Sequence, residues 1–289
     1  MSAVSFLRLR RLVQEKLDLP LGKEAKYSYS YDRDLLVGIP RKLAREQIDL
    51  FADMPFNGGD FWNCYELSWL NSKGKPEVRI VQFFVPFDSE SIVESKSVKL
   101  YLNSYNGTKF TDENEVVALL KSDLERVTNS DIELSVKSLI EFSSDRLVMF
   151  DGVCLDELDI EVNEYNVNSK LLKLSDDLQI VEEVVYSNLL KSNCLVTNQP
   201  DWASVQIKYR GRKINHKSLL QYIISFRNHS EFHEQCVEHM FNDIIKQCLP
   251  MELTIFAKYT RRGGVDINPY RTNTIFKTTD IDKYRDIRQ

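Results

Sequence analysis

A cysteine and an aspartate lie seven residues apart in the polar stretch SNCLVTNQPDWASVQIKY, residues 192–209. A thiolate nucleophile needs partial exposure and nearby hydrogen-bond donors or positive charge, which Lys191 and the loop hydroxyls could supply to Cys194. Asp201 precedes Trp202, and a carboxylic acid packed against an aromatic ring can have a raised pKa and donate a proton at neutral pH. These residue types would suit attack by a thiol followed by proton donation.

Both residues also have ordinary structural interpretations. Free cysteine is among the most buried residue types and is usually inert, which we expect for Cys236 and Cys248 on the apolar stripe of the helix predicted for residues 232–248. The neighbours of Cys194 are polar and it falls on a connection, so the pattern leaves its role open. An aspartate after a proline is typical of a turn or a cap, and the pattern alone favours a turn at Asp201.

Further acidic and basic candidates lie where two helices are predicted to begin. His233 and Glu234 open the 232–248 helix, and Glu94 lies one turn before the apolar stripe of an earlier helix. A zinc-binding HExxH motif is absent because the fifth residue is Val237, so we expect no metal site. A carboxylate can accept both protons of the amidine-like N–H pair of guanine or pterin. Alternatively, Glu94 could serve only as a partner of the helix dipole.

Basic residues and a glycine pair follow the alternating strand predicted for residues 251–259. Arg261 and Arg262 precede Gly263 and Gly264, and such a run lets guanidinium and backbone groups approach a phosphate closely. An ordinary basic turn has the same composition. Neither GxGxxG nor GxxxxGK[ST] is present, so a nucleotide would have to bind by another route.

The composition is typical of a globular protein of one large or two modest domains. The 289 residues are 43% hydrophobic and 28% charged, and the net charge of −5 argues against broad nucleic-acid binding. No apolar run approaches the roughly 20 residues that span a bilayer. The first residues place arginines inside their apolar stretch, unlike a secretory signal. Five widely spaced cysteines without a CxxC indicate free thiols. We therefore expect a cytoplasmic protein with no membrane contact.

The hydrophobic periodicity predicts the same element order in both halves of the chain, strand–strand–helix–helix–strand. The elements expected in the first half are strands 62–70 and 78–85, helices 98–105 and 116–124, and strand 132–136. Those expected in the second half are strands 184–190 and 205–209, helices 219–224 and 232–248, and strand 251–259.

A weak internal repeat supports this duplication. The segment SKSVKLYLNSYN, residues 95–106, resembles HKSLLQYIISFRN, residues 216–228, at an offset of 121. The matched identities are Lys96 with Lys217, Ser97 with Ser218, Tyr101 with Tyr222 and Ser104 with Ser225. So few identities could arise by chance, but their agreement with the repeated element order favours a duplication.

Five segments together resemble a known family, the NADPH-dependent 7-cyano-7-deazaguanine reductases, which are the nitrile reductases of queuosine biosynthesis. They are YELSWLNSKGKP, ESKSVKLYLNSYN, LLKSNCLVTNQPDWASVQIKYRG, SFRNHSEFHEQCVEHMFNDI and YTRRGGVDINPYR, and they span residues 31–271, with a looser match over 129–177. The resemblance implies an α+β protein of the long form, with two tandem tunnelling-fold modules. Each module would be an antiparallel sheet with two helices packed on one face. We expect an N-terminal extension over residues 1–30, a first module over 31–165 and a second over 166–289.

The resemblance also implies roles for individual residues. Cys194 would add to the nitrile carbon to form a covalent thioimide, Asp201 would donate the proton, and NADPH would deliver hydride twice to give 7-aminomethyl-7-deazaguanine. The residues implied to bind the substrate are Val93, Glu94, Ser95, His233 and Glu234. Those implied to bind NADPH are Ser95, Lys96, Arg262 and Gly263. No metal and no nucleic acid would bind directly, and a homodimer would cover the open sheet edges.

Two alternatives belong to other functional classes. One is a purine- or pterin-binding enzyme of the same fold, whose hydrolases typically need the zinc ligands that this chain lacks. The other is a non-catalytic deazapurine-binding module.

Overall fold

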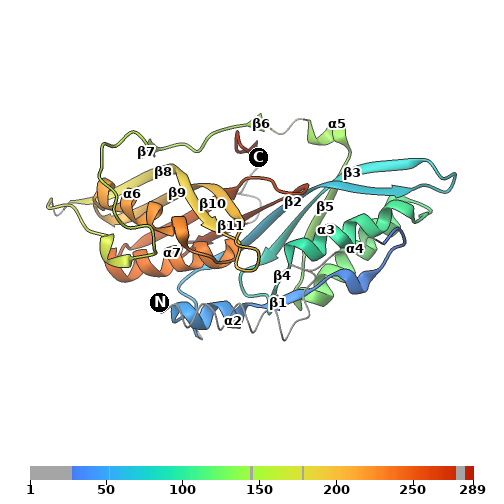
Figure 1. Ribbon diagram of the computed structural model, residues 1–289, viewed down its shortest axis with the longest axis horizontal. Coiled ribbons are helices and arrows are strands. Elements are labelled where there is room, and N and C mark those ends of the chain that lie inside the picture. Colours follow the sequence, from blue (N-terminus) through green and yellow to red (C-terminus); the bar gives the residue numbers. More distant parts are fainter. Residues whose placement is uncertain (1–27, 52, 144–145, 178, 278–283) are drawn as a thin grey trace. The chain divides into compact units, whose positions relative to one another are not determined.

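The computed structural model describes residues 28–51, 53–143, 146–177, 179–277 and 284–289, which form two compact units (Figure 1). The first unit contains residues 28–51, 59–143 and 261–267 of the described chain. The second contains 53–58, 146–177, 179–260, 268–277 and 284–289. The predicted boundaries after residues 30 and 165 remain a prediction, and the predicted N-terminal extension lies almost entirely outside the described residues. None of the helices in the described part of the chain is long and apolar enough to cross a membrane.

The first unit is an antiparallel sheet covered by two helices. Its sheet has the order β5-β3-β2, and β1 pairs separately with β4. The strands are β1 (Gly38–Pro40), β2 (Asn57–Leu70), β3 (Pro76–Pro86), β4 (Ser91–Val93) and β5 (Glu133–Lys137). The α-helices are α2 (Arg41–Arg45), α3 (Ser95–Ser104), α4 (Glu113–Thr128) and α5 (Leu139–Phe142), and the 3-10 turns are η1 (Arg33–Leu35), η2 (Glu46–Ile48) and η3 (Tyr105–Gly107).

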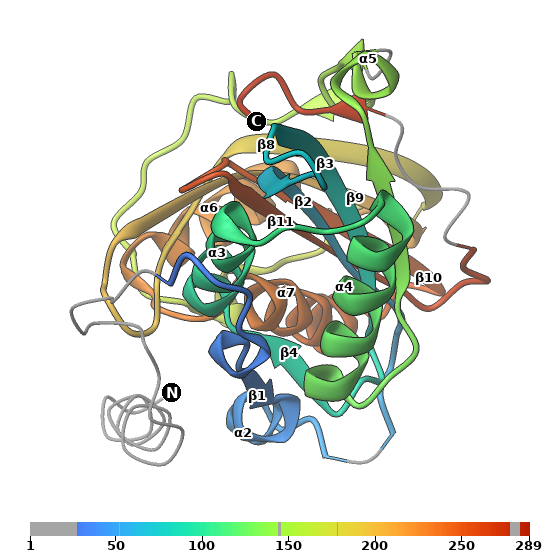
Figure 2. The same ribbon diagram turned by 90° about the vertical axis from the view of Figure 1, so that its right-hand side faces the viewer.

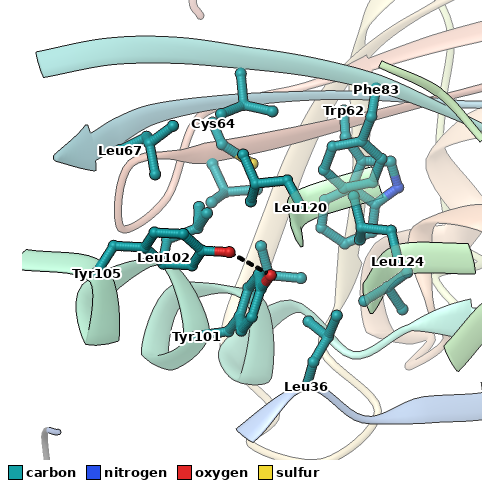
Figure 3. Packing of buried hydrophobic residues seen from close by; sticks show 14 of the residues in the cluster. Leu36, Trp62, Cys64, Leu67, Phe83, Tyr101, Leu102, Tyr105, Leu120 and Leu124 are labelled. Atoms are coloured by element: carbon teal, nitrogen blue, oxygen red, sulfur yellow. Dashed lines mark hydrogen bonds between the residues drawn. The ribbon is translucent and has the colours of Figure 1, made fainter. Parts of the chain in front are cut away.

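The core of the first unit lies between its strands and helices α3 and α4, which are on the same side of the strands (Figures 2 and 3). Trp62 and Cys64 are fully buried on β2, and the residue between them is partly exposed, as the period of two in a strand requires. Leu120 and Leu124 are one helical turn apart on α4 and face the same core. Burial of such side chains contributes about 1.5–3 kcal/mol each and fixes the helices on the sheet.

The second unit has the same construction. Its strands have the order β11-β10-β9-β8-β7, all antiparallel except the pair β7–β8. They are β7 (Val153–Cys154), β8 (Ile180–Asn193), β9 (Pro200–Arg212), β10 (Glu252–Tyr259) and β11 (Val265–Thr272), of which β11 begins in the first unit. Helix α6 (His216–Ser225) contacts β8, and α7 (His233–Cys248) contacts β10 (Figure 1). The remaining elements are β6 (Arg146–Leu147), η4 (Ser169–Leu171), η5 (Phe226–Asn228) and β12 (Tyr284–Arg285), which pairs with β6.

The two units repeat each other in detail. Helices α3 and α6 both have 10 residues, α4 and α7 both have 16, and the long strands β2 and β8 both have 14. The hydroxyl of Tyr101 donates to Asp123, and that of Tyr222 donates to Asp243, each over 2.8 Å. The predicted α+β class with two tandem modules is therefore confirmed.

Candidate active site

Cys194 lies in the connection between β8 and β9, directly after the last residue of β8. Its backbone N–H donates to Gln199 O over 2.8 Å, and its own carbonyl accepts from the N–H of Asn198 over 2.9 Å. Asn198 has a φ of 59°, a left-handed conformation that asparagine tolerates better than most residues. These bonds close the turn and fix the backbone of Cys194. Its side chain is buried, with 8% of its surface exposed.

Asp201 is part of strand β9, so the predicted turn at this position is wrong. The pairing of β8 with β9 continues to the connection, with Asp201 opposite Ser192. The preceding Pro200 is the first residue of the strand, a position where the missing N–H is tolerated. The carboxylate is buried, and its Oδ2 lies 3.3 Å from Nε2 of His233. The hairpin therefore carries the thiol and the acid on the same end of two paired strands.

His233 is the first residue of α7, and two contacts fix its ring. The imidazole stacks on the ring of Tyr259 with centroids 3.7 Å apart and an angle of 5° between the planes. Its Nε2 faces Asp201, whereas its buried Nδ1 has no hydrogen-bond partner among the described residues. Glu234 follows in the first turn of α7 and is 4% exposed. The helix dipole stabilises the Glu234 carboxylate at this helix N-terminus. The Nδ1 of His233, the residue before it, is available to a ligand.

Lys191, which the sequence offers as a cation near Cys194, has other partners. Its Nζ donates to Asn193 Oδ1 and to the carbonyl of Arg227, each over 2.6 Å. Burial and the nearby guanidinium of Arg227 lower the pKa of the amine. The lysine therefore ties the end of β8 to the segment that precedes α7.

Glu94 lies in the first unit, between β4 and α3, and caps that helix. Its two carboxylate oxygens accept the N–H groups of Lys96 and Ser97 over 2.9 and 2.7 Å. Burial raises the pKa of the carboxyl group, although these two hydrogen bonds oppose the shift. Val93 is buried beside it, whereas Ser95 and Lys96 are partly exposed in the first turn. The interpretation of Glu94 as a partner of the helix N-terminus is confirmed, and each oxygen retains a lone pair for a ligand.

Arg262 begins a tight turn in which the two glycines are required. Its N–H donates to the carbonyl of Val265 over 2.9 Å, and Gly263 and Gly264 have φ angles of 58° and 71°. A Cβ on Gly264 would lie 2.3 Å from Cδ of Glu66, so any side chain there would displace that carboxylate. Glycine therefore allows close packing as well as the left-handed backbone.

A cavity of about 80 Å³ lies beside this turn in the first unit. Gly263, Lys99 and Asn103 line it, together with Glu66 of β2. The turn contacts α3, because a Cβ on Gly263 would lie 3.1 Å from Cε of Lys99. The cavity is far smaller than the ~300–1,000 Å³ of a site for a whole ligand of drug size. A lysine amine, an amide and glycine backbone can hold an anionic group there, although the carboxylate of Glu66 opposes it. Sequence reasoning did not select Lys99, although it lies three residues after Lys96 on one helix.

The structure thus brings the candidate residues together in two groups. In the second unit, Cys194 and Asp201 lie on one hairpin, and Asp201 contacts His233 at the start of α7. In the first unit, the loop and first turn of α3 carry Val93, Glu94, Ser95 and Lys96, and the turn with Arg262 and Gly263 packs on the same helix.

His229, Glu231 and His239 form a further cluster that sequence reasoning missed, and Glu231 and His239 are buried. Their ligand atoms are within 4.8 Å of one another. The carboxylate of Glu231 is, however, already 2.7 and 3.0 Å from the two imidazoles, which are the distances of ion pairs and hydrogen bonds. We therefore describe the cluster as a charge network. Only the fold brings it together, because His239 lies six residues beyond the start of α7.

Comparison with known proteins gives matches over nearly the whole chain. Residues 27–136 match the family described as nitrile reductase, 7-cyano-7-deazaguanine-reductase N-term, and residues 200–277 match the family described as QueF-like protein. The NADPH-dependent 7-cyano-7-deazaguanine reductases of Cupriavidus taiwanensis and Paraburkholderia phymatum are each 50% identical to this chain, over 93% of it and 98% of the relative. A crystal structure of the archaeosine synthase QueF-Like in the apo form covers 35% of this chain and 100% of its own, with 15% identity and a TM-score of 0.29.

Proposed function

Because this chain belongs to the family of NADPH-dependent 7-cyano-7-deazaguanine reductases, we propose that it reduces the nitrile 7-cyano-7-deazaguanine to 7-aminomethyl-7-deazaguanine in queuosine biosynthesis. The observation that carries the proposal is the 50% sequence identity with a reductase over 98% of its length. The hairpin that presents Cys194 and Asp201 supplies groups suited to this chemistry.

The first step is nucleophilic. The S–H bond of Cys194 breaks as its sulfur bonds to the nitrile carbon, one of the C–N π bonds breaks, and the nitrogen takes up a proton, which gives a thioimide. Asp201 supplies that proton and is reprotonated by the proton that leaves the thiol, and its contact with His233 keeps the carboxyl group oriented. A nitrile is a poor hydride acceptor, so conversion to a C=N bond divides one difficult step into two easier ones.

The second group of residues holds the cofactor and part of the substrate. NADPH supplies two hydrides, which with two protons convert the nitrile into the amine and release the thiol of Cys194. Ser95, Lys96, Arg262 and Gly263 bind the cofactor, and the glycine turn and the adjacent cavity with Lys99 fit an anionic group of it.

The substrate is recognised through its guanine-like edge. Glu94 and Glu234 are each able to accept N–H groups of such a ring, and both carboxylates are buried, where such charge-assisted hydrogen bonds are strong. Val93 and Ser95 flank Glu94 on the chain, and the Nδ1 of His233, which has no partner among the described residues, is available to a ligand beside Glu234. The proposal includes a homodimer. It also places the protein in the cytoplasm, which its five cysteines without disulfide bonds support.

The proposed reaction is tested by mixing the purified chain with the nitrile and NADPH and following absorbance at about 340 nm. We expect about two NADPH to be oxidised per nitrile, because two hydrides reduce a nitrile to an amine. Cys194→Ala should oxidise none. A wild-type protein that binds the nitrile but oxidises no NADPH would refute the proposal in favour of a binding module.

A further inference from the structure

We propose that Glu231, held between His229 and His239, is a positioning residue that fixes the turn of Cys194 against the start of α7. This inference rests on the proposed function, since it concerns the reaction of Cys194 with the nitrile. It assigns to Glu231 no contact with the substrate.

The backbone around Glu231 is joined directly to the turn. The N–H of Asn193, the residue before Cys194, donates to the carbonyl of His229 over 2.8 Å, and the N–H of Glu231 donates back to Asn193 O over 3.1 Å. Between them, Oγ of Ser230 donates to the side-chain oxygen of Asn198, in the same turn, over 3.1 Å. Displacement of residues 229–231 would therefore displace the backbone on both sides of Cys194.

The side chain of Glu231 anchors this segment to the helices. Its Oε1 lies 3.0 Å from Nδ1 of His239 on α7 and 2.7 Å from Nε2 of His229, although the latter contact lacks hydrogen-bond alignment. Nε2 of His239 lies 3.6 Å from Asp243, which accepts the hydroxyl of Tyr222 on α6. The carboxylate thus connects the turn of Cys194 to both helices of the second unit. The anchored segment ends two residues before His233, so the same contact sets the start of α7.

The cluster depends on its charges, because Glu231 is only 2% exposed and its Oε2 has no hydrogen-bond partner among the described residues. Burial alone would raise the pKa of its carboxyl group, but His229 and His239 lower it to about 2. Burial likewise opposes protonation of His239, yet the carboxylate of Glu231 raises its pKa overall. The other titratable groups that face the cluster are Tyr222 on α6 and Cys236, Asp243 and Lys246 on α7. An ionised carboxylate in this place needs a cation beside it, and protonated His239 supplies one.

The sign of the pH effect follows from these shifts. His239 has a raised pKa in the folded chain, so its contribution is fully present below its ordinary value of about 6.5 and is lost as pH rises through the raised value. Glu231 has a lowered pKa, so its contribution is present above its ordinary value of about 4.5 and lost only as pH falls through about 2. The anchor should therefore weaken on the alkaline side, while Glu231 itself stays ionised.

The experiment follows formation of the Cys194 adduct by intact-protein mass spectrometry, with the nitrile present and NADPH omitted. Glu231→Gln should lower the rate of adduct formation by about tenfold or more, because even a small displacement of a nucleophile slows its reaction. KM for NADPH should stay unchanged. The matched control is Glu183→Gln, which breaks a Glu–His–Tyr contact at the opposite end of β8, about 30 Å of strand away, and should react at the wild-type rate.

A second variant keeps the test decisive if Glu231→Gln fails to fold. His239→Arg retains a positive charge that does not titrate in this range, so the ratio of wild-type to variant adduct rates should fall as pH rises through the raised pKa of His239. A constant ratio, or Glu231→Gln reacting at the wild-type rate, would overturn the positioning role. Loss of adduct formation on addition of a chelator would also overturn it, because the cluster would then be a metal site. A wild-type protein that forms no adduct would instead refute the proposed function.

Discussion

Replacing Asp201 by Asn alters the side chain by one atom and separates its chemical role from its structural role. The pairing of β8 with β9 is made by backbone groups, so Asp201→Asn should leave the hairpin intact. The variant weakens the 3.3 Å contact with His233 but also removes the cost of burying an ionisable group. These effects oppose each other, so we expect the free energy of unfolding to change by about 1 kcal/mol or less.

The chemical effect of the same variant should be much larger. A positioned general acid contributes about 10²–10⁴-fold, which corresponds to about 3–5 kcal/mol of the activation free energy. The introduced side-chain amide cannot take over as the proton donor, because an amide N–H is far less acidic than a carboxylic acid. Single-turnover adduct formation, followed by stopped-flow absorbance and mass spectrometry, should therefore slow by about 100-fold or more.

The matched control is Asp156→Asn. Asp156 also accepts hydrogen bonds beside β8, from Ser187 and Asn188, but lies away from the turn of Cys194. This variant should form the adduct at the wild-type rate. A folded Asp201→Asn protein that also reacts at the wild-type rate would refute the role of Asp201 as proton donor.

Three further predictions concern the first unit. Gly264→Ala should lower the free energy of unfolding by about 1–2 kcal/mol, because the alanine must adopt a left-handed φ of 71° and displace Glu66. Chemical denaturation measures this change. The variant should also raise KM for NADPH, which steady-state kinetics measures. Glu94→Ala should cost about 1 kcal/mol through loss of the cap on α3, measurable by thermal unfolding, and an unchanged KM for the nitrile would contradict its binding role. Burial raises the pKa of Glu94, so its protonated form stabilises the fold below about pH 4.5; the unfolding free energy of the wild type relative to Glu94→Gln should fall as pH rises through the raised value.

Local sequence patterns were sufficient for the main helices, the longest strands and their duplication, but they did not predict β1, β4 or β11. The helical spacing around Tyr101 and Tyr222 predicts α3 and α6, and the matched serines and tyrosines occupy equivalent positions in the two units. Burial of Cys236 and Cys248 on α7 is confirmed, as the apolar stripe predicts. These features depend on residues that are neighbours along the chain, where periodicity is informative.

Contacts between distant residues could not be predicted in the same way. The turn expected at Asp201 is a strand because its pairing with Ser192 depends on the register of the whole hairpin. Glu231 contacts His239 only when the segment before α7 lies against that helix, and no sequence motif marks such a pair. The resemblance to reductases, which the comparisons confirm at the level of the family, identified Cys194 as a candidate where the pattern left its role open. The roles of the individual site residues remain proposals.

Formation of a covalent bond between Cys194 and the nitrile is the central claim, and intact-protein mass spectrometry tests it most directly. The wild-type chain, incubated with 7-cyano-7-deazaguanine alone, should gain the mass of one nitrile, and peptide mapping should place the adduct on Cys194. Cys194→Ala should gain none, although it still folds, since removal of one buried sulfur atom leaves only a small cavity. An adduct on Cys194→Ala, or its absence from an active wild-type protein, would contradict the account.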